Sequence, residues 1–222
     1  MIQQSTAAPS ETDSEDSIAG GPNNTNDQLD NCNLPENFEP IEDIICYGIG
    51  SIESSRNSQF QLALGICLKE ALQVKGTLSI FDPIMTDLDK ELAEKLGCRV
   101  LEQNDQSYVG IKTRTLFYMP HCPKGLYSQI LESNWTSECL SRIVIIGNRF
   151  TMYDESPLFR QIERQAPFIL PALSIASVSP FPVEKFEDNT VFNDLAIHTF
   201  SPKTADLPAV SLEDREQDPE ML

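Results

Sequence analysis

The fold of this chain is decided by the stretch Asp43-Ile44-Ile45-Cys46-Tyr47-Gly48-Ile49-Gly50-Ser51-Ile52-Glu53-Ser54-Ser55-Arg56. A short apolar run breaks at two glycines into a polar turn, and apolar residues at helical spacing follow, which predicts a strand, a tight turn and a helix. Gly48 and Gly50 let backbone amides approach a ligand, and a helix N-terminus favours anions. Two interpretations stay open: a site for a phosphate, carboxylate or nucleotide-like ligand, or glycines that only permit a strand-to-helix turn.

The alternation of strand and helix patterns continues outward from this stretch. Apolar runs of strand length lie at about 43–48, 77–81, 98–102, 115–119, 142–148 and 194–200, and helical patterns at about 57–73, 86–96, 124–133 and 154–165. The run 166–174 contains two prolines and is predicted to be a peripheral strand or extended connection, and 194–200 an edge strand. The order predicts one Rossmann-like α/β domain at 41–200, a three-layer fold with helices on both faces of a mostly parallel sheet. Ligands of such sheets bind beyond the carboxyl ends of the strands.

Charge is concentrated in the two ends of the chain. Residues 1–43 hold ten acidic residues and no Lys or Arg, and residues 201–222 hold six acidic residues against two basic ones. We therefore predict a disordered acidic N-terminal arm at 1–40 and a disordered acidic C-terminal tail at 201–222. Such acidity disfavours nucleic acid and anionic membranes as partners of these two segments, because each phosphate contact needs a cation, and solvated disorder without a partner is the main expectation for them. For the chain as a whole we expect protein partners, no membrane and no direct nucleic-acid binding.

The six cysteines indicate a reducing compartment. They stand at positions 32, 46, 67, 98, 122 and 139 without a C-x-x-C pair. Cys46 and Cys67 lie in a predicted strand and a predicted helix, which suits buried thiols better than disulfides. No signal layout is present and no apolar run approaches the roughly 18 residues that a bilayer span needs, so a cytoplasmic or nuclear protein is expected. Two histidines and scattered cysteines make no zinc tetrad, so no metal site is predicted.

Several distinctive motifs occur together over roughly residues 43–200. They are Cys46-Tyr47-Gly48-Ile49-Gly50-Ser51, Gln59-Phe60-Gln61-Leu62-Ala63, Phe81-Asp82-Pro83, Leu116-Phe117-Tyr118-Met119-Pro120-His121-Cys122-Pro123, Asn134-Trp135, Ile146-Gly147-Asn148 and Phe192-Asn193-Asp194. Together these motifs resemble the sensitivity-to-red-light-reduced family. The resemblance implies a eukaryotic regulatory protein, tied to circadian clock gene expression and light signalling in plants and to heme biosynthesis in animals. Fungal relatives are linked to microtubule function and proteolysis. The resemblance implies no particular reaction.

The predicted ligand-binding residues stand where strands end. They are Gly48, Gly50, Ser51, Ser54, Arg56, Asp82, His121, Gly147 and Asn148. Asp82 ends the second strand, where a carboxylate can accept hydrogen bonds from a ribose or cap the next turn. A dinucleotide fingerprint needs a third glycine where Glu53 stands, which weakens an NAD interpretation. A methyl-donor site usually has an acidic residue at the position that Cys46 occupies, so an S-adenosylmethionine interpretation is weakened too.

His121-Cys122-Pro123 is the sharpest chemical cluster of the sequence. A cysteine before proline places a thiolate on a rigid, exposed turn, where Cys122 could be an axial ligand of heme; the alternative is a turn that only ends the strand. Asn193, Asp194 and His198 form a later polar set. Three hypotheses result: a regulator that binds a small ligand in the glycine-turn crevice, an enzyme using a nucleotide or S-adenosylmethionine-like cofactor, and a heme sensor through Cys122.

Overall fold

The structure is a computed structural model that describes residues 39–103, 110–183, 186, 188–202 and 207–221. By its internal contacts the chain divides into residues 1–36 and 37–222, and all described residues belong to the second unit. Residues 1–38 of the predicted N-terminal arm lie outside the described residues.

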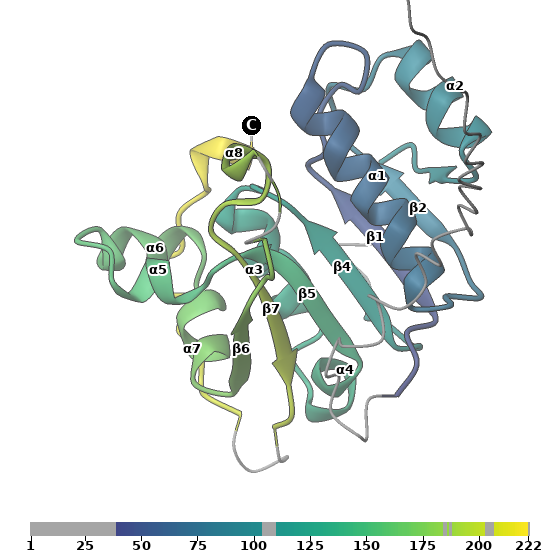
Figure 1. Ribbon diagram of the computed structural model, residues 1–222. Coiled ribbons are helices and arrows are strands. Elements are labelled where there is room, and N and C mark those ends of the chain that lie inside the picture. Colours follow the sequence, from purple (N-terminus) through teal and green to yellow (C-terminus); the bar gives the residue numbers. More distant parts are fainter. Residues whose placement is uncertain (1–38, 104–109, 184–185, 187, 203–206, 222) are drawn as a thin grey trace, which may run out of the picture. The chain divides into compact units, whose positions relative to one another are not determined.

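One seven-stranded sheet forms the centre of this unit (Figure 1). Its strands are β1 (Asp43–Tyr47), β2 (Leu78–Phe81), β3 (Arg99–Val100), β4 (Thr115–Met119), β5 (Ile143–Asn148), β6 (Ala176–Pro180) and β7 (Leu195–Phe200), in the order β3-β2-β1-β4-β5-β7-β6. Strands β1 to β5 pair in parallel, and β7 is antiparallel to both of its neighbours, β5 and β6. The predicted Rossmann-like α/β fold with a mostly parallel sheet is confirmed.

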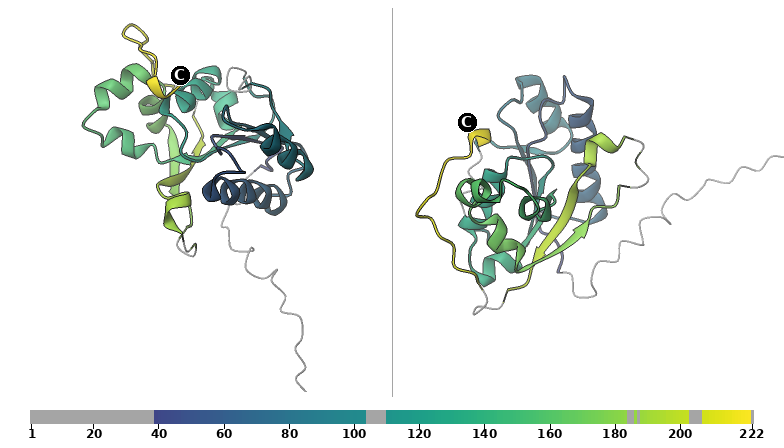
Figure 2. Two further views of the ribbon diagram at one scale, coloured as in Figure 1. Left: turned by 90° about the horizontal axis from the view of Figure 1, so that it is seen from above. Right: turned by 90° about the vertical axis from the view of Figure 1, so that its left-hand side faces the viewer.

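Helices cover both faces of the sheet (Figures 1 and 2). One layer contains α1 (Arg56–Ala71), α2 (Asp87–Lys95) and the short α8 (Asn189–Phe192). The other contains α3 (Lys124–Ser133), α4 (Ser137–Ser141), α5 (Thr151–Asp154), α6 (Phe159–Gln165) and α7 (Ile169–Leu173). A 3₁₀ turn, η4 (Pro219–Met221), follows near the C-terminus.

Strict alternation along the strands divides the core into two parts. Ile45 and Tyr47 of β1 face the α3 side, whereas Ile44 and Cys46 face the α1 side. The same division holds for β4 and β5, because successive side chains of a strand point to opposite faces. Both faces are buried, which explains why these strands read as continuous apolar runs.

Helix α1 buries a different face from the one its large apolar residues suggest. Its buried residues are Ser58, Gln61, Leu62 and Gly65. Gly65 allows the close approach, since a Cβ there would lie 3.4 Å from the Cys46 sulfur. Cys46 is buried as predicted, but Cys67 is exposed because it points away from this face.

Three predicted elements of the second half differ from the structure. The helix predicted at 154–165 is divided into α5 and α6, with Pro157 between them. The run 166–174 is not extended: it forms α7, where Pro171 is tolerated because the amides of a first helical turn have no intrahelical partner. The strand predicted at the edge, β7, lies inside the sheet, because the unpredicted β6 forms the edge.

Residues 207–221, here called the C-terminal segment, do not form the predicted disordered tail. Leu207, Val210 and Met221 pack against the core, and the Asp218 side chain is buried. The segment runs beside the helical layer that contains α3 and α6 (Figure 2). Specific ion pairs and apolar contacts hold it there, which composition alone does not reveal.

Candidate functional site

The glycine turn after β1 is held by groups of the protein itself. Gly48 and Gly50 have φ angles of 71° and 81°, in the left-handed region. A Cβ at Gly48 would clash with the Cys122 sulfur, so glycine lets Cys122 lie close against the turn. Asp82 accepts hydrogen bonds from the Gly50 amide at 2.8 Å and from the Ile84 amide at 2.9 Å. The Gly50 amide, expected to face a bound anion, thus faces an internal carboxylate.

The polar residues after the glycines do not converge on one ligand. Ser51 is buried and hydrogen-bonds Asp89, while Ser54 and Arg56 are exposed. The Arg56 guanidinium lies 5.2 Å from the centre of the Phe60 ring. Of the predicted loop residues, only the two glycines adjoin the other candidate groups.

Asp89 is a structural residue that the sequence-based site did not include. Its buried carboxylate accepts hydrogen bonds from the Glu53 amide at 2.7 Å and the Thr86 amide at 2.9 Å. Burial acts to raise the pKa of Asp89, but the hydrogen bonds from Thr86, Glu53 and Ser51 outweigh it and the pKa is lowered. Asp89 therefore ties the glycine turn to the start of α2. Its sequence signal is the spacing of a capping box that begins at Thr86.

A cavity of about 390 Å³ lies at the carboxyl ends of β4 and β5, where β7 begins. We call it the carboxyl-edge cavity. It is lined by His121, Cys122, Lys124, Asn148, Met152, Tyr153, Asn193, Asp194 and Glu220. These residues come from four separate parts of the chain. The structure thus brings the predicted His121, Cys122 and Asn148 together with Asn193 and Asp194 of the later polar set, and adds Glu220 of the C-terminal segment.

Asn148 is fixed at the wall of this cavity. Its side-chain amide donates to the Cys122 carbonyl at 3.1 Å and to the Tyr153 hydroxyl at 3.1 Å. Its backbone amide donates to the Tyr127 hydroxyl at 2.9 Å, and that hydroxyl donates to the Met119 carbonyl. A Cβ at the predicted Gly147 would lie 2.6 Å from the same hydroxyl, so this glycine makes room for a tyrosine rather than a ligand.

Two residues of the cavity have unusual backbone conformations. His121 and Asp194 both have a φ of 56°, in the left-handed region. Among the described non-glycine residues only Gln73 shares this property. The Nε2 of His121 lies 3.1 Å from the Val191 carbonyl, and the Arg149 amide donates to the Asp194 carbonyl at 2.8 Å. These contacts hold both conformations in place.

Cys122 is not on the exposed turn predicted for it. Its side chain is buried, and burial, followed by the charge of Asp82, raises the pKa of its thiol far above the ordinary value. The thiol is therefore protonated at neutral pH, whereas an axial heme ligand of this kind is a thiolate. The burial of Cys122 therefore argues against the prediction that this residue is an axial heme ligand. Among the described residues no cluster of three metal-ligating side chains exists.

His198, the second histidine, lies in the core and outside the cavity. Its Nε2 accepts a hydrogen bond from the Phe150 amide at 3.2 Å, and its Nδ1 lies 3.4 Å from the Ile145 carbonyl. Burial lowers its pKa to about 4, despite the opposing effect of the backbone carbonyls. His198 is thus a neutral structural histidine that joins β7 to the loop after β5.

Comparison with known proteins explains why the motifs at these strand ends occur together. The sequence model of the SRR1 domain matches residues 23–199. The chain belongs to the SRR1 domain family. This confirms the family resemblance found in the sequence. The carboxyl-edge cavity is formed by residues of the SRR1 domain except for Glu220, which follows it.

Relatives of this SRR1-domain chain come from plants and animals. It is 36% identical over 160 residues to the protein SENSITIVITY TO RED LIGHT REDUCED 1 of Arabidopsis thaliana, which covers 71% of this chain and 58% of the plant protein. It is 35% identical over 127 residues to the SRR1-like protein of Mus musculus, which covers 56% of this chain and 51% of the mouse protein. The chain thus spans little more than half the length of these curated relatives.

Solved structures resemble the fold of the SRR1-domain chain only distantly. The 23S rRNA methyltransferase ErmE aligns with a TM-score of 0.39 and 13% identity, over 76% of this chain and 65% of the ErmE chain. Nothing about activity follows from a likeness of this size. Within the described part of the chain, no helix has the length and apolarity needed to cross a bilayer.

Proposed function

We propose that this SRR1-domain chain is a regulatory protein that responds to a small polar ligand bound in the carboxyl-edge cavity. The family resemblance implies circadian clock gene expression and heme biosynthesis as the regulated processes. The proposal moves the ligand from the glycine turn, where Asp82 occupies the Gly50 amide, to the neighbouring cavity over β4 and β5.

The left-handed backbone of both His121 and Asp194 is the observation that carries this proposal. A non-glycine residue in this region costs on the order of 1–2 kcal/mol, and such residues cluster at functional sites. Here two of them line one cavity, at the sheet edge where Rossmann-like proteins bind ligands. If these positions only formed turns, glycine would adopt the same backbone conformation without this cost in conformational energy.

The lining indicates the chemistry of the ligand. The Lys124 ammonium has protons beyond the one directed at Asp218 and can donate hydrogen bonds. The carboxylates of Asp194 and Glu220 can accept them, as can the side-chain carbonyl of Asn148, whose two N–H bonds are already engaged. The volume of about 390 Å³ suits a molecule of nucleoside size. We therefore expect a nucleotide-like or similarly polar metabolite that offers both donors and acceptors.

Thermal-shift screening with nucleotides, S-adenosylmethionine and hemin tests the proposal. A ligand present at ~100 times its dissociation constant adds about 2.7 kcal/mol of stability. We expect a nucleotide-like compound to raise the melting temperature of the native chain, and this shift to be lost in Asn148→Leu and His121→Gly. Ser54→Ala, on an exposed loop residue outside the cavity, is the control that keeps the shift.

The same screen separates the alternatives predicted from the sequence. S-adenosylmethionine binding that depends on Asp82 rather than Asn148 would favour the cofactor-dependent enzyme. A hemin-induced Soret shift that disappears in Cys122→Ala would favour the heme sensor. A chain that no compound stabilises, or that is stabilised equally in the cavity variants, would refute ligand binding in the carboxyl-edge cavity.

A further inference from the structure

The C-terminal segment is held by three charged contacts in a fixed order. Arg215 donates to both carboxylate oxygens of Glu132 on α3, each at 2.8 Å. Glu216 accepts from the Arg164 guanidinium on α6 at 3.1 Å, and its backbone amide donates to the Arg164 carbonyl at 3.0 Å. Side chains and backbone of the segment are thus both recognised by the groove between α3 and α6.

The third contact is the most buried. Asp218 lies 2.7 Å from the Lys124 ammonium and accepts from the Gly125 amide at 2.7 Å, and its side chain is 1% exposed. Pro123, at the N-cap of α3, makes no side-chain hydrogen bond to the helix, so Asp218 supplies the missing cap from a distant part of the chain. A Cβ at Gly125 would lie 2.8 Å from the Asp218 Cβ, so glycine permits this approach.

The groove and its occupant belong to different parts of the sequence. Glu132, Arg164 and Lys124 lie inside the matched SRR1 domain, which ends at residue 199, whereas the whole C-terminal segment follows it. The segment carries five acidic residues and one arginine, and its charges are opposite to the groove charge at each of the three contacts.

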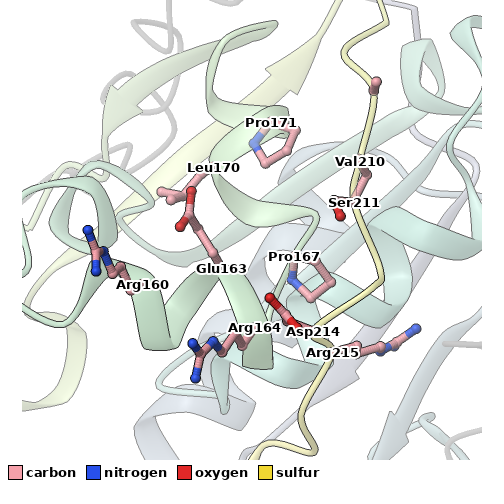
Figure 3. A pocket seen from close by; sticks show the side chains of 11 residues that line it. Arg160, Glu163, Arg164, Pro167, Leu170, Pro171, Val210, Ser211, Asp214 and Arg215 are labelled. Carbon is pink, nitrogen blue, oxygen red and sulfur yellow. The ribbon is translucent and has the colours of Figure 1, made fainter.

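The segment does not fill its groove completely. A cavity of about 480 Å³ lies between residues 209–215 and the helices α6 and α7. Figure 3 shows Arg160, Glu163 and Pro171 on the helical wall of this cavity, opposite the C-terminal segment. A second cavity of about 390 Å³ lies between residues 215–221 and Gln129 of α3. The groove therefore has room for an occupant with larger side chains.

We propose that the groove between α3 and α6 is a docking site for an extended acidic segment of a partner protein, read as Arg-Glu-x-Asp. Glu132, Arg164 and the Lys124–Gly125 pair bind the Arg, Glu and Asp of this motif. The chain's own C-terminal segment occupies the groove in cis and competes with the partner. Because Glu220 lines the carboxyl-edge cavity, docking of a partner segment also removes one wall of that cavity. The proposal does not depend on any ligand in that cavity.

A fluorescent peptide with the sequence of residues 207–221 tests the proposal in trans, by anisotropy against full-length chains. The chain with Arg215→Ala and Asp218→Asn, here called the segment variant, has a weakened cis occupant and an unchanged groove. A tethered segment has an effective concentration near the millimolar range, so we expect this variant to bind the peptide at least ~10-fold more tightly than the native chain. The same peptide with Asp218→Asn should bind this variant at least ~10-fold more weakly.

A charge exchange provides the matched control. Adding Glu132→Arg to the segment variant should abolish binding of the native peptide and restore binding of a peptide with Arg215→Glu. Far-UV circular dichroism and urea denaturation verify that each chain is folded.

Three results would overturn the proposal. They are absence of peptide binding to the folded segment variant, equal binding of the native and Asp218→Asn peptides, and sedimentation of the native chain as a dimer that Glu132→Arg converts to a monomer. The third result would mean that the segment of a second copy occupies the groove. Hydrogen exchange at the Gly125 amide provides an independent measurement. In the segment variant without peptide this amide should exchange fast, and excess unlabelled peptide should make its exchange slow. Fast exchange with peptide present contradicts docking at this site. Failure of the ligand screen described above would leave each of these results unaffected.

Discussion

His198 makes the stability of this chain depend on pH in a way that one substitution can remove. The Phe150 amide donates to its Nε2, so the proton of the neutral ring is on Nδ1, beside the Ile145 carbonyl. Protonating Nε2 would break the first contact and place a charge in the core. Replacing His198 with Gln keeps a neutral hydrogen-bonding side chain at this position at every pH.

The magnitude follows from the pKa of His198. It is about 4 in the folded chain against 6.5 in the unfolded chain, and each pKa unit corresponds to about 1.4 kcal/mol. Between these values the unfolded chain binds more protons, so stability rises with pH through the window and is lost on acidification. The full difference is about 3 kcal/mol, of which about 2 kcal/mol is lost on going from pH 7.5 to pH 5.

Urea denaturation of the native chain and of His198→Gln at several pH values between 7.5 and 5 measures this effect. We expect the variant to be about 1–2 kcal/mol less stable at pH 7.5, because Gln does not reproduce the packing of the imidazole, and the gap to close as the pH falls. The series stops at pH 5 to stay above the isoelectric point of about 4.3, where association is favoured. Parallel stability profiles for the two chains over this range would refute the argument.

The two turns beside the candidate site and the burial of Cys122 can each be tested by substitution or labelling. Asp89→Ala should lower the free energy of unfolding by about 2 kcal/mol, because two backbone amides lose their acceptor, whereas Asp87→Ala, on an exposed carboxylate of the same helix, should cost much less; equal losses in urea denaturation would contradict the role of Asp89. Gly48→Ala should cost more than about 2 kcal/mol through backbone strain and contact with Cys122, and adding Cys122→Ala should recover part of the loss; no recovery would show that the contact is not the cause. In the native chain iodoacetamide should modify the exposed Cys67 long before the buried Cys122, and peptide mass spectrometry that finds both labelled at similar rates would rule out the burial of Cys122.

The first half of the fold was predictable because local signals agree with the tertiary structure. The glycine turn, the buried strands and the cap at Thr86 each have a sequence pattern that also suits the sheet. In the second half, local and tertiary preferences disagree. The prolines of 166–174 suggest an extended chain, yet packing of Ile169 and Ala172 against the core stabilises a helix. The edge strand β6 has five residues, of which two are serines and none is buried, so its sequence carries only a weak strand signal.

The candidate site was predictable only in part, for reasons of geometry. Residues that follow parallel strands meet at one edge of a sheet, and His121, Cys122 and Asn148 lie together there, while their role in ligand binding stays a prediction. The sequence could not show that the Gly50 amide donates its hydrogen bond to Asp82, or that Cys122 is buried, because both depend on contacts between distant segments. Nor could composition show that an acidic stretch after residue 200 docks on α3, since that requires the positions of the basic groups it meets.

The outermost strands of the sheet limit how another chain can attach to it. β3 has two residues, and β6 ends at Pro180, which has no amide hydrogen to offer. Short strands and proline at the margins of a sheet suppress backbone zipping between molecules, which is the first step of strand addition and of amyloid-type assembly. An extended segment of another protein therefore has to be recognised by side chains of the helical layer. Mutations that lengthen β3 or replace Pro180 should make the chain more prone to aggregate.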